Sequence, residues 1–573
     1  MKVLYSILCI MLGSFAYAQQ TPYEKSNFQQ TARYSEVIEY YQHLDKQYKQ
    51  ARLVSYGATD FGKPLHLFIL SKDQDFDPAS IRSRNKCVLL INNGIHPGEP
   101  EGIDASMMLC RDLLSKDALP DDVVICIIPL YNIGGSFNRS STSRANQNGP
   151  ETYGFRGNSK NYDLNRDFIK TDSKNSGSFQ EIFNAWQPEI FIDNHTSNGS
   201  DYQHVMTLIP TQKDKLNPIL SKYLTQKLVP GIYNSMEASG YFLVPYVQSI
   251  GETPEEGIIE YFESPRYSTG YASLHNSIGF MPETHMLKDY KARVDATYQL
   301  MQSFIDFIQF DAGEIRKNRQ LADQMTMQQQ HFDLQWELDT TMVDSLIFRG
   351  FKGKYKPSLV SGKPRLYYDR DDPYEKPIPV LNTFKPVLSI EKPAAYIIPK
   401  AWSRVSDLLK LNGVVLDTLK QDTVLQVESY YITDYQTRSQ PYEGHYVHSN
   451  VQVKPVTQSI PYYTGDIIVY TQQSKNLYII NTLEPQGIDS FFAWNFFDSV
   501  LDQKEHFSPY IFEDTAIDIL KANPELQQAL DARKAQDKTF ASDAYAQLAF
   551  IYRHSDYYEK THRRYPVARI LHP

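Results

Sequence analysis

The feature that most constrains this chain is a set of two histidines and one carboxylate. His96 and Glu99 are three residues apart in the segment His-Pro-Gly-Glu, and His195 follows a short apolar run later in the sequence. Two imidazoles and one carboxylate can fill three corners of a tetrahedral Zn2+ and leave the fourth open for water. Because an open position is typical of catalytic zinc, we expect the fold to bring these three side chains together.

Short apolar runs rich in Ile and Val flank these residues, and each predicts a buried central strand. The runs are residues 87–92, 123–129 and 190–193. They alternate with helical patterns, the first over residues 102–114, and this alternation predicts an α/β fold. His96 and His195 each follow a predicted strand. In open α/β sheets ligands collect at the carboxyl ends of strands, so we expect both histidines at one rim.

Length and charge limit the classes of protein to which the chain can belong. Its 573 residues, 41% of them hydrophobic, exceed what one core usually organises and indicate two or three domains. The formal net charge is -9, and Lys and Arg form no long block. We therefore expect neither a nucleic-acid partner nor a polybasic membrane patch.

The first eighteen residues have the pattern of a secretory signal. Lys2 supplies the charged start, residues 3–15 the apolar stretch, and Ala16-Tyr17-Ala18 a small-x-small cleavage site. The apolar stretch is too short to span a bilayer, and no later stretch reaches eighteen uninterrupted apolar residues. We expect cleavage after about Ala18, a periplasmic or secreted protein, and no integral membrane segment after the signal is removed.

The composition changes along the rest of the chain. A polar, Gln-rich helical pattern leads out of the first region, and short alternating runs rich in Val, Ile, Tyr and Thr follow it. Two of these runs, 466–471 and 476–480, are interpreted as strands, and a helical pattern returns over 516–538. The predicted divisions are a signal peptide at 1–18, a catalytic domain at 19–310, a helical connector at 311–344, a β-rich accessory domain at 345–482, and a mainly helical C-terminal region at 483–573.

A second group of polar residues lies between the predicted strands, in the segments Arg156-Gly-Asn and Asn165-Arg166. The planar fork of Arg166 matches a carboxylate, and Asn165 adds a neutral donor, so the pair could bind a terminal carboxylate of a substrate. Arg156 could instead face the metal and stabilise an oxyanion. The alternative is that these are solvated loop residues paired with Asp163 and Asp167.

A third group is the segment Met281-Pro-Glu283-Thr-His285. A strand here places Met281, Glu283 and His285 on one face. Opposite a metal-activated water, Glu283 could take a proton and later deliver it to a leaving amine. The alternative for Glu283 is an ion-paired structural acid, and we expect His285 to be its hydrogen-bonding neighbour rather than a fourth metal ligand.

The ordered set of these residues resembles the zinc carboxypeptidases of the funnelin type, over about residues 30–305. The set is His96, Glu99, Arg156, Asn165, Arg166, His195 and Glu283. The resemblance implies a mixed central sheet flanked by helices and one Zn2+ held by the two histidines and Glu99. It also implies Glu283 as general base, Arg156 as the oxyanion contact, and Asn165 with Arg166 as the carboxylate anchors. The family uses a mobile Tyr to cover the substrate, for which Tyr261, Tyr267 and Tyr271 are the candidates.

The resemblance implies an exported metallocarboxypeptidase that acts on the C-termini of peptides, and it leaves rivals open. Thr196-Ser197 follows His195 where digestive members of the family carry Ser-Tyr, so specificity is not set by the likeness. One rival is a deacylase of acylated amino acids. A second is an amidase or carboxypeptidase that trims peptidoglycan stem peptides. A third, from a different class, is a catalytically inert protein that binds peptide or glycan.

Overall fold

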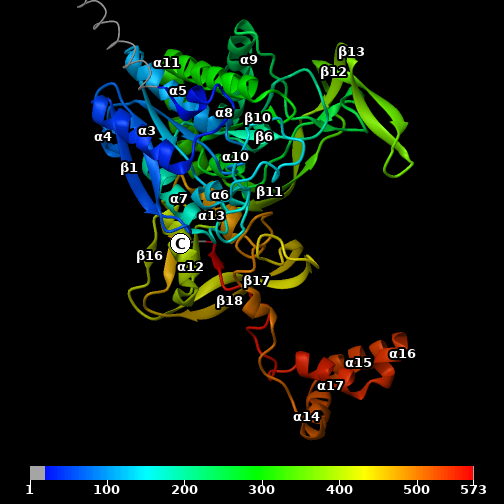
Figure 1. Ribbon diagram of the computed structural model, residues 1–573. Helices are drawn as coiled ribbons and strands as arrows, with labels where there is room; N and C mark the ends of the chain where they lie inside the picture. The colour runs from blue at the N-terminus through cyan, green and yellow to red at the C-terminus, as the bar shows by residue number, and fades with distance from the viewer. Residues whose placement is uncertain (1–19, 572–573) are drawn as a thin grey trace, which may run out of the picture.

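The computed structural model describes residues 20–571 (Figure 1), so the predicted signal segment lies outside the described residues. The centre of this part of the chain is an eight-stranded mixed sheet with the order β1-β2-β4-β3-β5-β10-β6, and β7 pairs with β10. The strands are β1 (Ala51–Ala58), β2 (Pro64–Leu70), β3 (Cys87–Asn92), β4 (Val123–Ile128), β5 (Ile190–Asp193), β6 (His195–Ser197), β7 (Met206–Pro210) and β10 (Ile278–His285). The three strands predicted from apolar runs are β3, β4 and β5.

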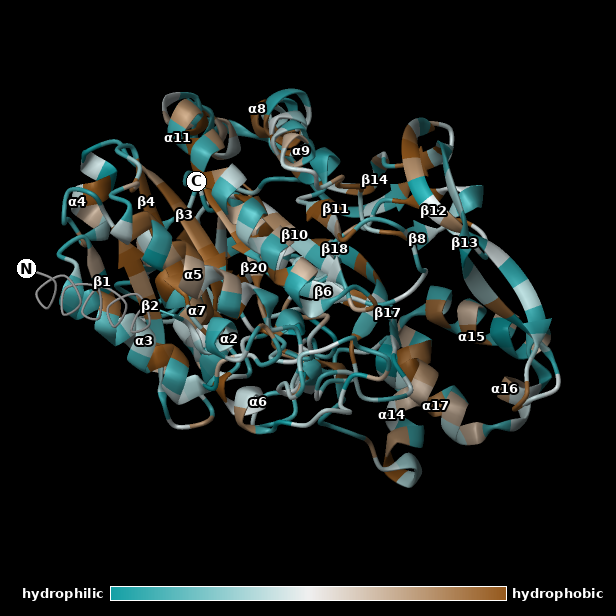
Figure 2. Cartoon of the chain, turned by 45° about the horizontal axis from the view of Figure 1, so that its top comes forward, coloured by the Kyte–Doolittle hydropathy of each residue, from teal (hydrophilic) through white to brown (hydrophobic). Residues whose placement is uncertain are grey.

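The middle strands β4, β3, β5 and β10 run parallel and are almost wholly buried, as parallel strands covered on both faces must be. Figure 2 shows β3 and β4 as largely hydrophobic ribbons. Successive residues alternate between the two faces. Leu89 and Ile91 belong to one buried cluster, whereas Val88 and Leu90 belong to the other.

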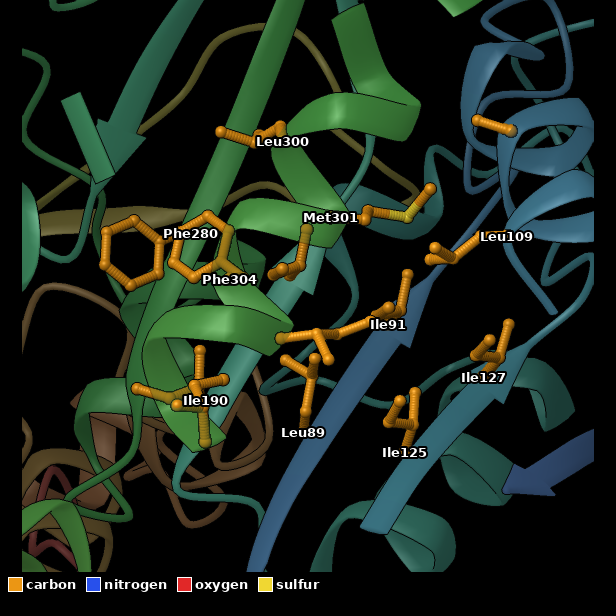
Figure 3. Packing of buried hydrophobic residues seen from close by; sticks show 14 of the residues in the cluster. Leu89, Ile91, Leu109, Ile125, Ile127, Ile190, Phe280, Leu300, Met301 and Phe304 are labelled. Atoms are coloured by element: carbon orange, nitrogen blue, oxygen red, sulfur yellow. The ribbon is translucent and has the colours of Figure 1, made fainter. Parts of the chain in front are cut away.

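Helices cover both faces of the sheet. One face is covered by α3 (Tyr34–Gln47), α5 (Glu101–Ser115), α8 (Pro218–Tyr223), α9 (Val229–Ala238) and the long α11 (Tyr290–Gln328). The other face carries α7 (Lys174–Trp186) and α10 (Ser268–Ser273). Figure 3 shows Leu300, Met301 and Phe304 of α11 packed over the strands. The predicted α/β class, with a mixed sheet flanked by helices, is confirmed.

The chain beyond α11 forms further sheets, one of which includes two short strands from the region before α11. The segment expected to be a helical connector is helical only to Gln328, and β11 (His331–Leu338) follows and pairs with β14 (Phe384–Glu391). A long hairpin of β12 (Asp344–Pro357) and β13 (Pro364–Leu381) projects from the body (Figure 1). It forms one sheet with β8 (Gln248–Ser249) and β9 (Ile258–Ile259) of the preceding region.

A six-stranded sheet of order β16-β19-β15-β20-β17-β18 follows. Its strands are β15 (Ala395–Ile398), β16 (Asp417–Thr418), β17 (Thr423–Thr437), β18 (His448–Tyr462), β19 (Ile467–Tyr470) and β20 (Ala568–Ile570), with α12 (Ser403–Leu411) and α13 (Asn476–Leu483) beside them. The strand predicted over 466–471 is confirmed as β19, but the strand predicted over 476–480 is wrong, because α13 occupies this segment. A short helix that buries Tyr478, Ile479 and Ile480 shows no periodicity to distinguish it from a buried strand.

The last helices form a small body with its own apolar cluster, set away from the sheets in Figure 1. They are α14 (Pro509–Ala522), α15 (Pro524–Gln536), α16 (Lys538–Ser542) and α17 (Ala544–Arg553). The remaining short elements are α2 (Pro22–Lys25), α4 (Pro78–Ser83), α6 (Ile133–Phe137), η1 (Leu164–Arg166), η2 (Lys213–Lys215), η3 (Leu224–Leu228), η4 (Pro254–Glu256), η5 (Lys400–Trp402) and η6 (Asp498–Leu501). Between residues 20 and 571 no helix is long and apolar enough to cross a membrane.

Candidate metal centre and its pocket

The fold brings the two histidines and the carboxylate of the predicted metal set together. His96 and Glu99 lie in the loop between β3 and α5, and His195 opens β6 at the same rim of the sheet. The chain leaves β3 through Gly94, whose φ of +66° is a left-handed conformation that glycine adopts without a steric penalty. One ligand atom from each of the three buried side chains lies within 4.8 Å of the others.

Carboxylates on the far side of each imidazole fix the orientation of the histidines. Asp163 Oδ1 lies 2.8 Å from His96 Nε2, and Asp193 Oδ2 lies 2.9 Å from His195 Nε2. Both rings therefore turn Nδ1 toward Glu99. The Nδ1 of His96 is buried without a hydrogen-bond partner among the described residues. A carboxylate behind each of two histidines is the usual support of metal-bound imidazoles, so this donor set fits zinc.

Glu99 lies at the centre of a dense set of charges. Its oxygens accept hydrogen bonds from Arg144 and from the backbone N–H of Thr196 at 2.9 Å, and Oε2 lies 3.0 Å from His195 Nδ1. Burial by itself raises the pKa of Glu99, but Arg144, His96 and His195 together hold it well below the usual value. Glu99 is therefore ionised at neutral pH, as a metal ligand requires.

The predicted general base stands beside this group on the neighbouring strand. β10 pairs with β6 so that Glu283 is opposite His195, and Glu283 Oε2 is buried without a hydrogen-bond partner in the described chain. Burial, followed by the negative charge of Glu99, raises the pKa of Glu283. His285 does not take the expected place beside Glu283. Same-face residues of a strand are about 7 Å apart, so the side chains of Glu283 and His285 need not meet. The Nδ1 of His285 instead accepts from Leu287 N–H, and its ring packs on Tyr202.

A cavity of about 860 Å³ opens in front of these residues and contains most of the predicted site. Arg156 lies at its edge, with Nη1 3.3 Å from Glu99 Oε1 and Nε 2.9 Å from Asp163 Oδ2. Arg144 lies deeper, since its side chain is 16% exposed against 45% for Arg156, and it also donates to the carbonyl of Thr196. Two guanidinium groups, rather than the one that was predicted, therefore face the pocket beside Glu99.

Asn165 and Arg166 also line the cavity, on the short helix η1. Asn165 is buried and its Oδ1 accepts from the backbone N–H of Ser268 at 3.1 Å, while the Arg166 guanidinium lies 4.3 Å from the centre of the Tyr267 ring. The alternative of a solvated loop paired with Asp163 and Asp167 holds in part, because Arg166 Nη2 lies 3.9 Å from Asp163 Oδ2, but the Arg166 side chain is mostly buried. Asp167 is fully buried and pairs with Lys170 instead.

The three candidate tyrosines for covering a substrate have different surroundings. Tyr261 and Tyr267 line the cavity with their ring centres 5.9 Å apart. Tyr271 is fully buried, and its hydroxyl donates to Asn412 at 2.6 Å on the other side of α10. A third ring, Tyr246, lies 5.8 Å from Tyr261 and lines the cavity as well. Tyr271 is therefore not placed to contact anything bound in the cavity.

Comparison with known proteins agrees with this geometry. A family model described as zinc carboxypeptidase matches residues 37–333, which is more than half of the chain. The chain belongs to the zinc carboxypeptidase family. It is accordingly a hydrolase of peptide bonds from a zinc-dependent family.

Individual relatives of this zinc carboxypeptidase are distant. Carboxypeptidase 2 of Trichophyton rubrum is 22% identical over 428 residues, which cover 71% of this chain and 74% of that protein. Carboxypeptidase 2 of Trichophyton equinum is 22% identical over 442 residues with the same coverage. Among solved structures, a metallo-carboxypeptidase from Pseudomonas aeruginosa covers 50% of this chain and 70% of its own, with 13% identity and a TM-score of 0.38.

Four side chains that line this cavity or contact its histidines were not assigned from the sequence. They are Arg144, Asp193, Tyr246 and Glu263. Asp193 was within reach of prediction, because it ends an apolar strand two residues before His195. Arg144 and Tyr246 come from long irregular segments, and only the path of the chain brings them to the pocket. Asp163 was considered only as an ion-pair partner of the arginines in its loop, whereas it also orients His96.

Proposed function

We propose that this zinc carboxypeptidase removes residues from the free C-termini of peptides, with one Zn2+ held by His96, Glu99 and His195. The observation that supports it best is the donor set itself. Two imidazoles, each backed by a carboxylate, converge with Glu99 at the wall of a large cavity. Zinc bound there would supply a Lewis acid that polarises the scissile carbonyl and lowers the pKa of water.

Glu283 is the proposed general base. Its Oε2 has no hydrogen-bond partner among the described residues and belongs to a side chain that lines the cavity. In this position it can accept a proton from the attacking water and donate it to the nitrogen of the leaving amine. A raised pKa suits this double role, since the proton must be both taken up and released near neutral pH.

The remaining polar residues of the pocket are proposed to bind the substrate. Arg166 and Asn165 provide donors for the terminal carboxylate, and Tyr261 and Tyr267 form the aromatic wall that covers it. Arg156 is proposed to contact the carbonyl oxygen as negative charge develops on it. Arg144 is the better buried of the two arginines beside Glu99 and is proposed to share this role.

The place of action is proposed to be outside the cytoplasm, on the basis of the signal-like segment 1–18. In that compartment both ordinary peptides and peptidoglycan stem peptides end in a carboxylate. The pocket's arginines would accept either, so the experiment must include both classes of substrate.

The test uses the purified, zinc-loaded protein and its Glu283→Gln variant. Each is incubated with peptides that have free or amidated C-termini and with stem peptides, and products are identified by mass spectrometry. We expect stepwise loss of C-terminal residues only from free-acid peptides, slowed about 10²- to 10⁴-fold in the variant. The zinc content of the two proteins should be equal when measured by atomic emission.

Other outcomes change the proposal in defined ways. Cleavage of stem peptides alone would make the protein a cell-wall peptidase. Bound zinc with no turnover of any substrate would favour the inert binding protein. Unchanged activity in Glu283→Gln would remove Glu283 from the mechanism.

A further inference from the structure

Besides Glu99 and Glu283, the pocket contains a buried carboxylate that the proposed mechanism does not use. Glu263 lies between β9 and α10, is only 2% exposed, and lines the same cavity as Asn165 and Arg166. A buried carboxylate is costly unless something compensates its charge. Its surroundings therefore indicate what kind of group it is arranged to meet.

One oxygen of Glu263 is bonded within the protein and the other is free. Oε2 accepts from the backbone N–H of Thr269 at 3.1 Å and from the hydroxyl of the same residue. Oε1 has no hydrogen-bond partner, and no cation forms an ion pair with this carboxylate within 4.0 Å, as far as residues 20–571 are concerned. The side chain thus enters the cavity with an unused acceptor.

The nearest lysine does not neutralise this acceptor directly. The ammonium group of Lys215 contacts the backbone carbonyl of Glu263 and lies 4.6 Å from the centre of the Phe262 ring. Lys215 and Phe262 line a different, much smaller cavity. Lys215 therefore acts on Glu263 at longer range and leaves the pocket side of the carboxylate open.

Short contacts link Glu263 to the residues proposed to hold the terminal carboxylate. Asn165 Oδ1 accepts from Ser268 N–H, and the next backbone N–H, that of Thr269, donates to Glu263. Asn165 and Glu263 therefore accept hydrogen bonds from two consecutive backbone N–H groups at the start of α10. The lining of the same cavity also includes Ile209 and Met281, which are paired in register on β7 and β10 and are apolar.

A cavity lined by both apolar residues and a buried carboxylate matches a side chain with an aliphatic stem and a cationic end, as Lys and Arg have. We propose that Glu263 is a specificity-determining residue, and that the enzyme prefers substrates whose C-terminal residue carries a cationic side chain. The inference rests on the proposed function, because it assigns the place of the terminal side chain. The rival explanation is that Glu263 only holds the start of α10 through Thr269.

The experiment compares peptides that differ only in the last residue: Arg, its neutral isostere citrulline, Lys, Met, and a stem peptide that ends in a diamino acid. For the wild-type, zinc-loaded enzyme we expect kcat/KM for Arg to exceed that for citrulline by about 10- to 100-fold, as for one charged hydrogen bond. In Glu263→Gln this ratio should fall to about threefold or less. Turnover of the citrulline and Met peptides should stay near the wild-type value.

Two further variants separate charge from shape. Glu260→Gln is the matched control, because it is the same substitution three residues earlier, at a side chain outside the cavity lining. This variant should keep the preference for a cationic C-terminal residue. Glu263→Asp keeps the charge and should keep part of the preference, and it also serves if Glu263→Gln folds poorly.

The outcomes that overturn the inference are distinct from those that overturn the function. If the wild type cleaves citrulline and Arg peptides equally well, Glu263 does not select for cations. If Glu263→Gln slows every peptide by the same factor, the residue is only structural. If the wild type cleaves no free-acid peptide at all, the proposed carboxypeptidase function itself fails.

Discussion

At the scale of single residues, the two candidate metal-binding histidines share one arrangement although they come from different segments. Each has a carboxylate at Nε2 and turns Nδ1 toward Glu99, so with zinc bound Nε2 would carry the proton and Nδ1 would be the metal donor. Asp193 is itself held by Asn92, whose side-chain N–H donates to it at 2.9 Å. The hydrogen bonds that orient the candidate metal ligands therefore include residues at the ends of β3 and β5.

This arrangement predicts that Asp193→Asn weakens zinc binding. Without the carboxylate, His195 loses the group that orients its ring and makes Nδ1 a better donor, so we expect the dissociation constant for zinc to rise about 10- to 100-fold. Competition with a chromophoric chelator measures this directly. Glu283→Gln, which changes no proposed ligand and no ligand's partner, should bind zinc as the wild type does. Equal zinc affinity in both variants would contradict the proposed role of Asp193.

At the scale of elements, the sequence predicted the strands and loops that a local pattern of apolar residues marks. Apolar runs located β3, β4 and β5, and the loops after them located His96, Glu99 and His195. The same reasoning failed at α13, because a short run buried on all sides has the same appearance in a strand and in a helix. It also extended the helical connector to residue 344, whereas α11 ends at Gln328, and it gave no indication that β11 pairs with β14.

The helix that follows the loop of His96 and Glu99 is held by a buried acid. Asp104 of α5 is fully buried and accepts hydrogen bonds from the hydroxyl of Tyr290 at the start of α11 and from the backbone N–H of Ala32 at 3.2 Å. Burial raises the pKa of Asp104 to about 7 from an ordinary value of 3.8. The folded protein therefore keeps this proton to a higher pH than the unfolded chain does.

The contribution of Asp104 to stability should depend on pH. It is fully favourable below pH 4 and is lost as the pH rises through about 7, because ionisation is easier in the unfolded chain. Asparagine resembles the protonated acid, so Asp104→Asn should gain on the wild type as the pH rises. From pH 5 to pH 8 the difference in the free energy of unfolding should grow by about 3 kcal/mol in favour of the variant. Denaturant titrations at both pH values test this, and a constant difference would contradict it.

At the scale of the whole molecule, residues beyond 440 form hydrogen bonds with the segments that carry residues of the zinc carboxypeptidase pocket. The side chain of Glu443 accepts from the backbone N–H of Asp163 at 2.8 Å. Asp489 accepts from the backbone N–H of Arg266 at 2.9 Å and from its guanidinium at 2.8 Å. No pattern in the sequence connects residues more than two hundred positions apart, so these contacts could not be predicted.

The contact between Asp489 and Arg266 bears on substrate binding because Tyr267 follows Arg266 directly. The Tyr267 ring lies over Arg166, and Arg266 lies 4.9 Å from the ring centre of Trp494. Asp489 is completely buried, so its charge is compensated chiefly by this arginine. Removal of one partner from a buried ion pair leaves the charge of the other uncompensated. We therefore expect the segment around Arg266 to shift when Asp489 is replaced.

We therefore expect Asp489→Asn to raise KM about tenfold for peptides with a free C-terminal carboxylate, with little change in kcat. The reason is that Arg266 would lose its compensating charge and displace Tyr267 and Arg166, while the groups around Glu99 and Glu283 stay in place. Steady-state kinetics on one peptide series measures both constants. The matched control is Asp502→Asn, which changes an exposed acid whose one ion pair between residues 20 and 571 is with Lys504. A variant that is less stable yet keeps the wild-type KM would show that these distant residues support the fold and not the binding of the terminal carboxylate.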